Sequence, residues 1–296
     1  MRICDVHVHY IPEELAVHTT FYKGVWTQKE RLYAFLQEHN IEKALLVYPS
    51  CDAHLKLGSV AEVCRIYNAA LERLIKENER IVAAAIIDIA DIGHSIQEIA
   101  TLKEKGFKAV SLTSSHDGRF MLKELTPVFA TIQESDLPVF IHPQTINPLG
   151  FERVKDPLLT PVLEYSLDSS MFMGLLMMEG VFERYAVKFI FSSLGGVVPF
   201  LRDRFDRVYT MLRRRGLVKD LGKAPSQILK NVYVDTSGSP QKNIQLAVEL
   251  FGEDKILWGS DYPVNSDVGE NLRMLEGFGP EVKEKIVGGN FLRIFS

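Results

Sequence analysis

The most constraining feature of this sequence is a regular alternation of short apolar runs with longer amphipathic stretches. Eight runs rich in β-branched residues alternate with stretches whose apolar residues recur at helical spacing. The predicted strands cover residues 3–9, 44–48, 81–88, 109–113, 138–142, 187–192, 232–235 and 256–260. The predicted helices cover residues 29–39, 60–78, 95–105, 122–135, 198–215, 244–251 and 281–291.

Several of these runs are apolar at almost every position, which is typical of parallel strands covered on both faces. An eightfold βα alternation predicts an α/β fold, a (β/α)8 barrel of the TIM type, with a doubly wound open sheet as the alternative. No linker or internal repeat divides the chain, so we expect one domain over residues 1–296. The longest interruption, residues 143–161, contains four prolines, and we expect a lid or binding loop there.

Composition excludes several classes of protein. The 34 Lys and Arg against 38 Asp and Glu give a formal charge of −4, which argues against a nucleic-acid partner. No apolar run approaches the roughly 18 residues of a membrane span, and the first residues lack the apolar core of a signal peptide. Cys4, Cys51 and Cys64 form no CxxC pair, so we expect reduced thiols. Together these features predict a cytoplasmic protein without a membrane partner.

The strongest chemical signal is His7-Val8-His9 at the end of the first predicted strand. Residues two apart in a strand point to the same side, so both imidazoles can reach one point at the mouth of a barrel. They are candidates for a shared metal ion, and two exposed histidines near a chain end are the plain alternative. Asp5 would lie below them, either orienting an imidazole or held by backbone amides.

Two further residues end predicted strands at the same mouth. His142 ends the fifth strand and Asp261 ends the eighth, and barrels place their catalysts at the carboxyl ends of strands. A core histidine and a turn-capping aspartate are the alternatives. Three imidazoles and one carboxylate suit zinc or a similar divalent ion with an open position for water. Asp235 ends the seventh strand and would contact substrate or cap the next helix.

These motifs together resemble the amidohydrolase superfamily. The resemblance rests on Asp5-x-His7-x-His9-x-x-Pro12, on Val-Phe-Ile-His-Pro at the fifth strand, on Leu-Gly-Gly after the sixth and on Gly259-Ser260-Asp261-Tyr262-Pro263. The branch typified by aminocarboxymuconate-semialdehyde decarboxylase is the most similar one. It implies a distorted (β/α)8 barrel with one catalytic metal on His7, His9, His142 and Asp261. Zinc is the first expectation for that metal and manganese the second.

The sequence departs from the family at the sixth strand. The family's general base is a His two residues before Gly-Gly, and Ser193 stands there instead. A Ser hydroxyl is a poor base near neutral pH. Either another His replaces it, or the metal and Asp261 suffice, or the chain lacks the family's chemistry; an engineered substitution is a fourth account. His54 and His116 are the candidate replacements, and His116 is also a candidate substrate contact.

Arg204 lies eleven positions after Ser193. In the decarboxylases, an Arg at that offset crosses a dimer interface and holds a substrate carboxylate. The resemblance therefore implies a homodimer and a substrate-binding Arg204, while a solvated helix face is the alternative. The family's other carboxylate-binding Arg has no match near the second strand.

Three functions follow from these features. The first is a metal-dependent lyase that decarboxylates a small unsaturated or aromatic carboxylic acid, with Asp261 moving a proton and Ser193 at the family's catalytic position. The second is a metal-dependent hydrolase of a lactone, ester or amide. The third is a catalytically weakened barrel that binds a metabolite or a partner protein, and Ser193 is the feature that favours it.

Overall fold

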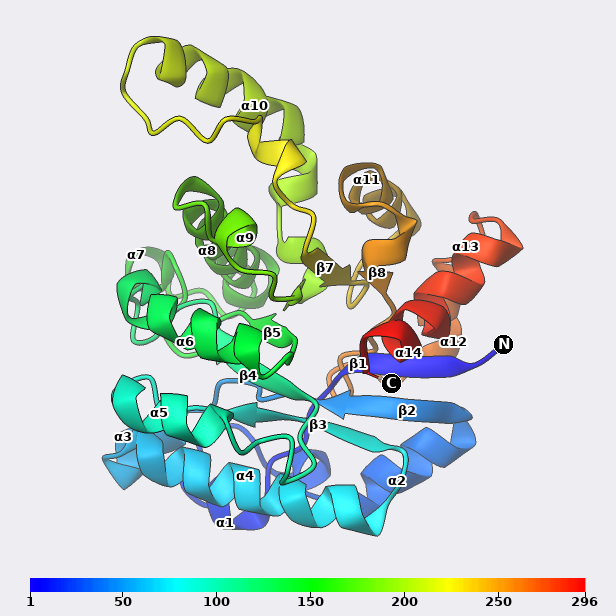
Figure 1. Ribbon diagram of the computed structural model, residues 1–296. Helices are drawn as coiled ribbons and strands as arrows, with labels where there is room; N and C mark the ends of the chain where they lie inside the picture. The colour runs from blue at the N-terminus through cyan, green and yellow to red at the C-terminus, as the bar shows by residue number, and fades with distance from the viewer. Residues whose placement is uncertain (296) are drawn as a thin grey trace.

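A computed structural model describes residues 1–295, in which eight parallel strands form one sheet in sequential order. Figure 1 shows the strands at the centre, with helices around them. The strands are β1 (Ile3–Val8), β2 (Ile41–Leu46), β3 (Ile81–Ile86), β4 (Ala109–Thr113), β5 (Val139–His142), β6 (Phe189–Phe191), β7 (Val232–Asp235) and β8 (Ile256–Leu257). The predicted (β/α)8 barrel is confirmed, and each observed strand overlaps its predicted range.

Hydrogen bonds between the last strand and the first close the sheet into a barrel. The Val6 amide donates to the Trp258 carbonyl oxygen at 3.0 Å, and the Asp261 amide donates to the His7 carbonyl oxygen at 2.9 Å. Closure removes both sheet edges and brings residues from opposite ends of the chain to one rim. The open-sheet alternative is therefore wrong.

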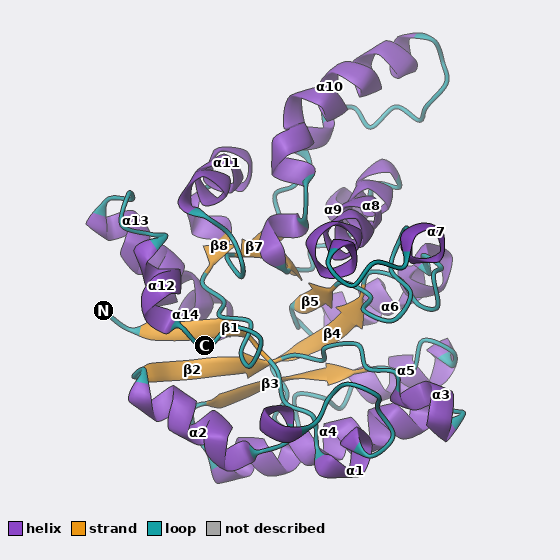
Figure 2. Ribbon diagram, turned by 180° about the vertical axis from the view of Figure 1, so that it is seen from behind, coloured by secondary structure: helices purple, strands orange, loops and turns teal. Residues whose placement is uncertain are grey.

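Helices surround the barrel, and Figure 2 shows them outside the strands. They are α1 (Glu13–Ala16), α2 (Lys29–Glu38), α3 (Ala53–Leu57), α4 (Val60–Glu77), α5 (Ile92–Ile99), α6 (Leu122–Glu134), α7 (Phe151–Val154), α8 (Tyr165–Met178), α9 (Val181–Arg184), α10 (Val198–Arg214), α11 (Gln241–Phe251), α12 (Val268–Arg273), α13 (Pro280–Glu284) and α14 (Asn290–Phe295). Shorter turns are η1 (Gly24–Trp26), η2 (Thr160–Glu164), η3 (Ser193–Gly195), η4 (Pro225–Gln227), η5 (Glu253–Lys255) and η6 (Lys285–Gly289).

The predicted helices leave out several short observed ones, among them α1, α3, α9 and α12, and three further differences are more informative. No helix is predicted over α8, because its apolar and small residues show almost no one-sided periodicity and it is buried on several sides. The segment 143–161, expected to be irregular, contains α7. The single helix expected over residues 281–291 is α13, η6 and the start of α14.

Alternate residues of the strands belong to two different apolar clusters. One packs strand residues such as Val110 and Ile141 against helix residues such as Phe129. The other draws at least one residue from each of the eight strands, including Phe140 and Ile190. Cys4, Cys51 and Cys64 are all free and buried, as expected of reduced thiols. Within residues 1–295, no helix has the length and apolar character that crossing a membrane requires.

Candidate metal centre

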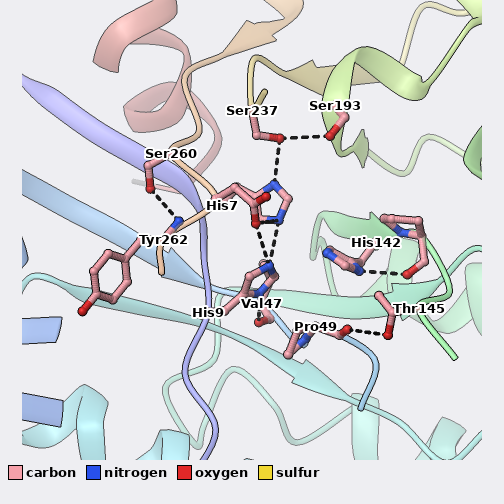
Figure 3. A network of polar contacts seen from close by, with 12 residues as sticks. His7, His9, Val47, Pro49, His142, Thr145, Ser193, Ser237, Ser260 and Tyr262 are labelled. Carbon is pink, nitrogen blue, oxygen red and sulfur yellow. Dashed lines mark hydrogen bonds and ion pairs between the residues drawn. The ribbon is translucent and has the colours of Figure 1, made fainter. Parts of the chain in front are cut away.

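Three histidines meet at the carboxyl end of the barrel. His7 lies in β1, His9 follows it and His142 ends β5. One ring nitrogen of each lies within 4.8 Å of the corresponding nitrogen of the other two. His7 Nε2 and His9 Nε2 are 3.0 Å apart, and Figure 3 shows these two rings side by side with His142 facing them. The structure thus brings together the three imidazoles that the sequence predicted as ligands.

The other ring nitrogen of each histidine is held by an oxygen. An Nδ1–H that donates to a fixed acceptor leaves the Nε2 lone pair free for a metal. All three rings are buried, so these hydrogen bonds fix their orientation. The bonds join His7 Nδ1 to Asp235 Oδ2 at 2.8 Å, His9 Nδ1 to the Val47 carbonyl oxygen at 3.0 Å, and His142 Nδ1 to the Pro143 carbonyl oxygen at 2.8 Å.

Asp261 places a carboxylate beside the same nitrogens. Its Oδ1 lies 3.1 Å from His9 Nε2 and 3.4 Å from His7 Nε2. The residue follows β8 with a φ of 66°, in the left-handed region that Asp tolerates better than most residues. Its amide bonds to β1, so the closure of the barrel itself positions this carboxylate.

The charges at this site favour a cation. Burial lowers the pKa of His9 and takes that of His142 well below its usual value, so these rings are neutral donors. Burial also opposes protonation of His7, but the Asp235 and Asp261 carboxylates raise its pKa to about 9. Neutral imidazoles beside carboxylates form a site where a divalent ion replaces an imidazolium proton.

The donor set therefore fits a single divalent metal ion. His7, His9, His142 and Asp261 are the residues that would hold it, through three nitrogens and one oxygen. Imidazole and carboxylate are accepted by zinc, manganese and similar ions, so this set alone does not choose among them.

Asp235 holds the ring of His7 in place, one of the roles that its position at the end of β7 allowed. Its side chain is fully buried at the end of β7, and it accepts hydrogen bonds from the His7 ring, the Ser193 amide and the amide and hydroxyl of Ser237. It thus orients His7, and it is not among the described residues that line the cavity. Asp5 instead accepts backbone amides, those of His7 and Ser260 at 3.0 Å each. The sequence feature that pointed to Asp235 was its position at the carboxyl end of a barrel strand, where such barrels carry their functional residues.

Ser193 lies at the mouth and is joined to this network. Its Oγ is 3.1 Å from Ser237 Oγ, which is 3.2 Å from His7 Nδ1 (Figure 3). Ser193 is exposed toward the cavity, whereas the neighbouring Ser192 hydroxyl is buried without a hydrogen-bond partner among residues 1–295. The Ser193 hydroxyl thus faces the cavity, at the sequence position where the resemblance implies a basic His.

The glycines after Ser193 are required by close packing. A Cβ on Gly196 would lie 2.2 Å from the Ser166 carbonyl oxygen in α8, and its φ is 69°. Only glycine combines that backbone conformation with so close an approach. The Gly-Gly motif therefore seats the turn after β6 against α8.

A large cavity of about 1370 Å³ opens over the histidines. Hydroxyl residues, among them Ser193, Ser237 and Thr145, line part of it near the metal ligands. Aromatic and aliphatic side chains such as Phe151 and Leu246 line other parts. The mixture suits a ligand with a polar head and an apolar body.

Two predicted substrate contacts do not line this cavity. His116 lines a smaller pocket with His54, and the Asp117 carboxylate lies 3.3 Å from His54 Nε2 and 3.5 Å from His116 Nε2. Arg204 is exposed on α10, which projects from the barrel with the loop after it (Figures 1 and 2). Neither of these side chains lines the cavity of its own chain: His116 belongs to the smaller pocket, and Arg204 lies on the projecting α10.

The segment after β5 is anchored by a buried carboxylate of α8. Asp168 accepts hydrogen bonds from the Ser114 and Ser115 hydroxyls and from the amides of Gln144 and Leu149. Burial raises the pKa of Asp168, although these hydrogen bonds oppose the shift. The cluster ties the β4 and β5 loops to α8 and so fixes one wall of the cavity.

Comparisons with known proteins agree with this geometry. The family model described as Amidohydrolase matches residues 4–296. Gamma-resorcylate decarboxylase of Polaromonas sp. (strain JS666 / ATCC BAA-500) is 27% identical over 296 residues, covering 90% of this chain and 87% of the relative. 2-Amino-3-carboxymuconate-6-semialdehyde decarboxylase of Dictyostelium discoideum is 23% identical, covering 78% of this chain and 66% of the relative.

A solved structure has the same fold. It is 5-carboxyvanillate decarboxylase of Novosphingobium aromaticivorans, complexed with manganese and a nitrobenzoic acid. The TM-score is 0.84 and the identity 22%, with 100% of this chain and 96% of the other covered.

Proposed function

The chain belongs to the amidohydrolase family, and we propose that it is a metal-dependent carboxy-lyase that decarboxylates a small aromatic or unsaturated carboxylic acid. The observation that carries the proposal is the meeting of three imidazole nitrogens and the Asp261 carboxylate at one mouth of the barrel. The decarboxylases named above support the choice of reaction.

The metal would be held by His7, His9, His142 and Asp261. When bound, a divalent ion supplies a Lewis acid that fixes the substrate and stabilises the negative charge developing in the transition state. Zinc remains our first expectation and manganese the second.

Asp261 is the group that we assign to proton transfer. The Asp235 side chain is fully buried, whereas 29% of the Asp261 side chain is exposed and the residue lines the cavity. Only Asp261 of these two carboxylates can therefore reach a substrate. It would take a proton from solvent and pass it to the carbon that carried the carboxylate, so that the new C–H bond forms as the C–C bond breaks and carbon dioxide leaves.

Ser193 would contact the substrate without acting as a base. Its hydroxyl forms a hydrogen bond with the Ser237 hydroxyl, and both hydroxyls can donate hydrogen bonds to a polar substituent of the substrate. We therefore assign Ser193 to orienting the substrate and leave the proton to Asp261.

We also propose a homodimer. On α10, Phe200, Val208 and Met211 are exposed apolar residues on the same helix face as Arg204. Such a face is typical of a surface that another chain covers. In a dimer, Arg204 would meet the cavity of the second copy; sedimentation velocity and the kinetics of Arg204→Ala test this.

The decisive experiment measures metal content and carbon dioxide release together. Protein purified without chelator is analysed for metals and assayed with gamma-resorcylate, other hydroxybenzoates and a lactone panel. The His7→Ala/His9→Ala double variant is measured beside His54→Ala/His116→Ala, which removes two histidines outside the cavity. We expect about one divalent ion per chain in wild type and control, and none in the first variant.

Three outcomes would overturn the proposal. Wild-type protein that binds no metal after incubation with divalent ions would exclude both enzyme functions. Lactone opening without carbon dioxide release would favour the hydrolase. Tight ligand binding without turnover on any acid would favour the weakened barrel.

A further inference from the structure

The wall of the cavity beside His9 consists of three aromatic residues that the proposed chemistry does not use. Trp26 stacks on the His9 ring, with the centroids 5.8 Å apart and 25° between the planes. Tyr22 and Phe21 pack on Trp26 at centroid distances of 4.8 and 5.8 Å. All three line the same cavity as the ligands. We name Phe21, Tyr22 and Trp26 the aromatic wall; it begins at a metal ligand.

Hydrogen bonds hold the aromatic wall in place. The Thr20 amide and hydroxyl donate to the Asp52 carboxylate at 3.1 and 2.6 Å. The Tyr22 hydroxyl donates to the Pro49 carbonyl oxygen at 3.0 Å. The residues on both sides of Phe21 are thus tied to the loop after β2, so the segment that carries the ring is held in place before a ligand binds.

The outer end of the aromatic wall is exposed. Trp26 and Tyr22 are buried, but 69% of Phe21 is accessible. Val264 and Leu246 also line the cavity, and 66% and 39% of them are accessible. A large exposed apolar surface that continues into a ligand cavity is typical of a binding groove.

The charges beside the aromatic wall disfavour an anion. Asp52, the anchor of Thr20, is itself a lining residue. Lys155 is the one Lys or Arg among the described residues that line the cavity, and its Nζ lies 3.2 Å from Glu152 Oε2. A second carboxylate at the wall would therefore lose hydration and meet a like charge, with no free Lys or Arg of the same chain among the described lining residues.

We propose that the aromatic wall is a specificity subsite for an uncharged apolar substituent of the substrate, such as an alkyl chain or a second ring, with Phe21 as its main contact. The inference rests on the proposed function, because it places the acid group of the substrate at the metal ligands. The cavity volume of about 1370 Å³ agrees with a substrate larger than one ring, since cavities for drug-sized ligands occupy roughly 300–1,000 Å³.

The test compares matched substrates on the zinc-loaded and on the manganese-loaded protein. The parent acid is gamma-resorcylate, and the derivatives carry a propyl, a pentyl or a carboxybutyl chain opposite the reacting carboxylate. We expect kcat/KM to rise up to about fourfold for each methylene that the wall buries. We expect the carboxybutyl compound to lose at least about tenfold against the pentyl compound.

Variants test whether the gain in kcat/KM from the alkyl chain depends on the aromatic wall. Phe21→Ala should reduce the pentyl-to-parent ratio by about tenfold, whereas Phe21→Leu should keep most of it. Leu55→Ala is the matched control, because 63% of Leu55 is exposed on α3 away from the cavity. Its ratio should equal that of the wild type.

Other results would contradict either the subsite or the proposed function. A carboxybutyl compound that reacts faster than the pentyl one, or a ratio insensitive to Phe21→Ala, would overturn the subsite. A shift of the sedimentation coefficient in Phe21→Ala without a change of ratio would show that a second copy covers the wall. If no acid is decarboxylated, the proposed function fails, and calorimetry of the same acids on the metal-loaded protein still decides the subsite.

Discussion

Replacing Asp235 with Asn should weaken metal binding without removing a ligand. Three donors, the amides of Ser193 and Ser237 and the Ser237 hydroxyl, converge on Oδ1, so the Asn oxygen must take that place. The Asn amide nitrogen then faces His7 Nδ1, which must become an acceptor. The His7 proton moves to Nε2, the atom that would hold the metal.

The expected magnitude follows from that change of tautomer. Loss of the oxygen that orients a ligating His costs about 10- to 100-fold in metal affinity. This corresponds to about 1.4–2.7 kcal/mol. Losing one hydrogen bond to a charged acceptor in a buried site should also cost about 1.5–3 kcal/mol in the free energy of unfolding.

Asp168→Asn is the matched control, because Asp168 is also a buried Asp with four hydrogen-bond donors but lies outside the metal centre. Chelator competition gives the manganese and zinc affinities, and urea denaturation of the metal-free proteins gives the stabilities. Both variants should lose stability, and only Asp235→Asn should lose affinity. Equal metal affinities in the two variants would refute the assignment of Asp235 to His7.

Three further variants test other parts of the site. Asp261→Asn should lower kcat by about 10²- to 10⁴-fold in single-turnover assays at saturating metal, because it removes the proton carrier; near-normal turnover would place that role elsewhere. Ser193→His should raise kcat near neutral pH in steady-state assays, because His tolerates the positive φ of 48° and faces the cavity; a loss would indicate a site adapted to the Ser193–Ser237 pair. Gly259→Ala should lower stability by about 1–3 kcal/mol and weaken metal binding, because its Cβ would lie 2.9 Å from His7 Cβ. Gly279→Ala is the control, because nothing lies within 4 Å of the added atom. Equal melting temperatures and metal titrations of the two variants would contradict the predicted crowding.

The sequence by itself determined the barrel and the ligand histidines. Apolar runs recurring between amphipathic stretches leave few topologies, and the parallel eight-stranded sheet follows from them. His7 and His9 share a side because strand geometry has a period of two, and His142 ends a strand at the same mouth. These are local properties of strands, so they can be predicted without knowing which elements pack against one another.

Only the tertiary structure decided which side chains hold the metal-ligating residues in position. The pairing of His7 with Asp235 joins residues 228 positions apart, and it exists because the barrel closes. The tertiary structure also separates His116 from the cavity and leaves Asp5 on backbone amides, although both residues looked suitable in the sequence. The aromatic wall also depends on a loop whose position is set by Asp52, in the segment after β2. Contacts between distant segments depend on packing and loop conformation, which no periodicity of the sequence records.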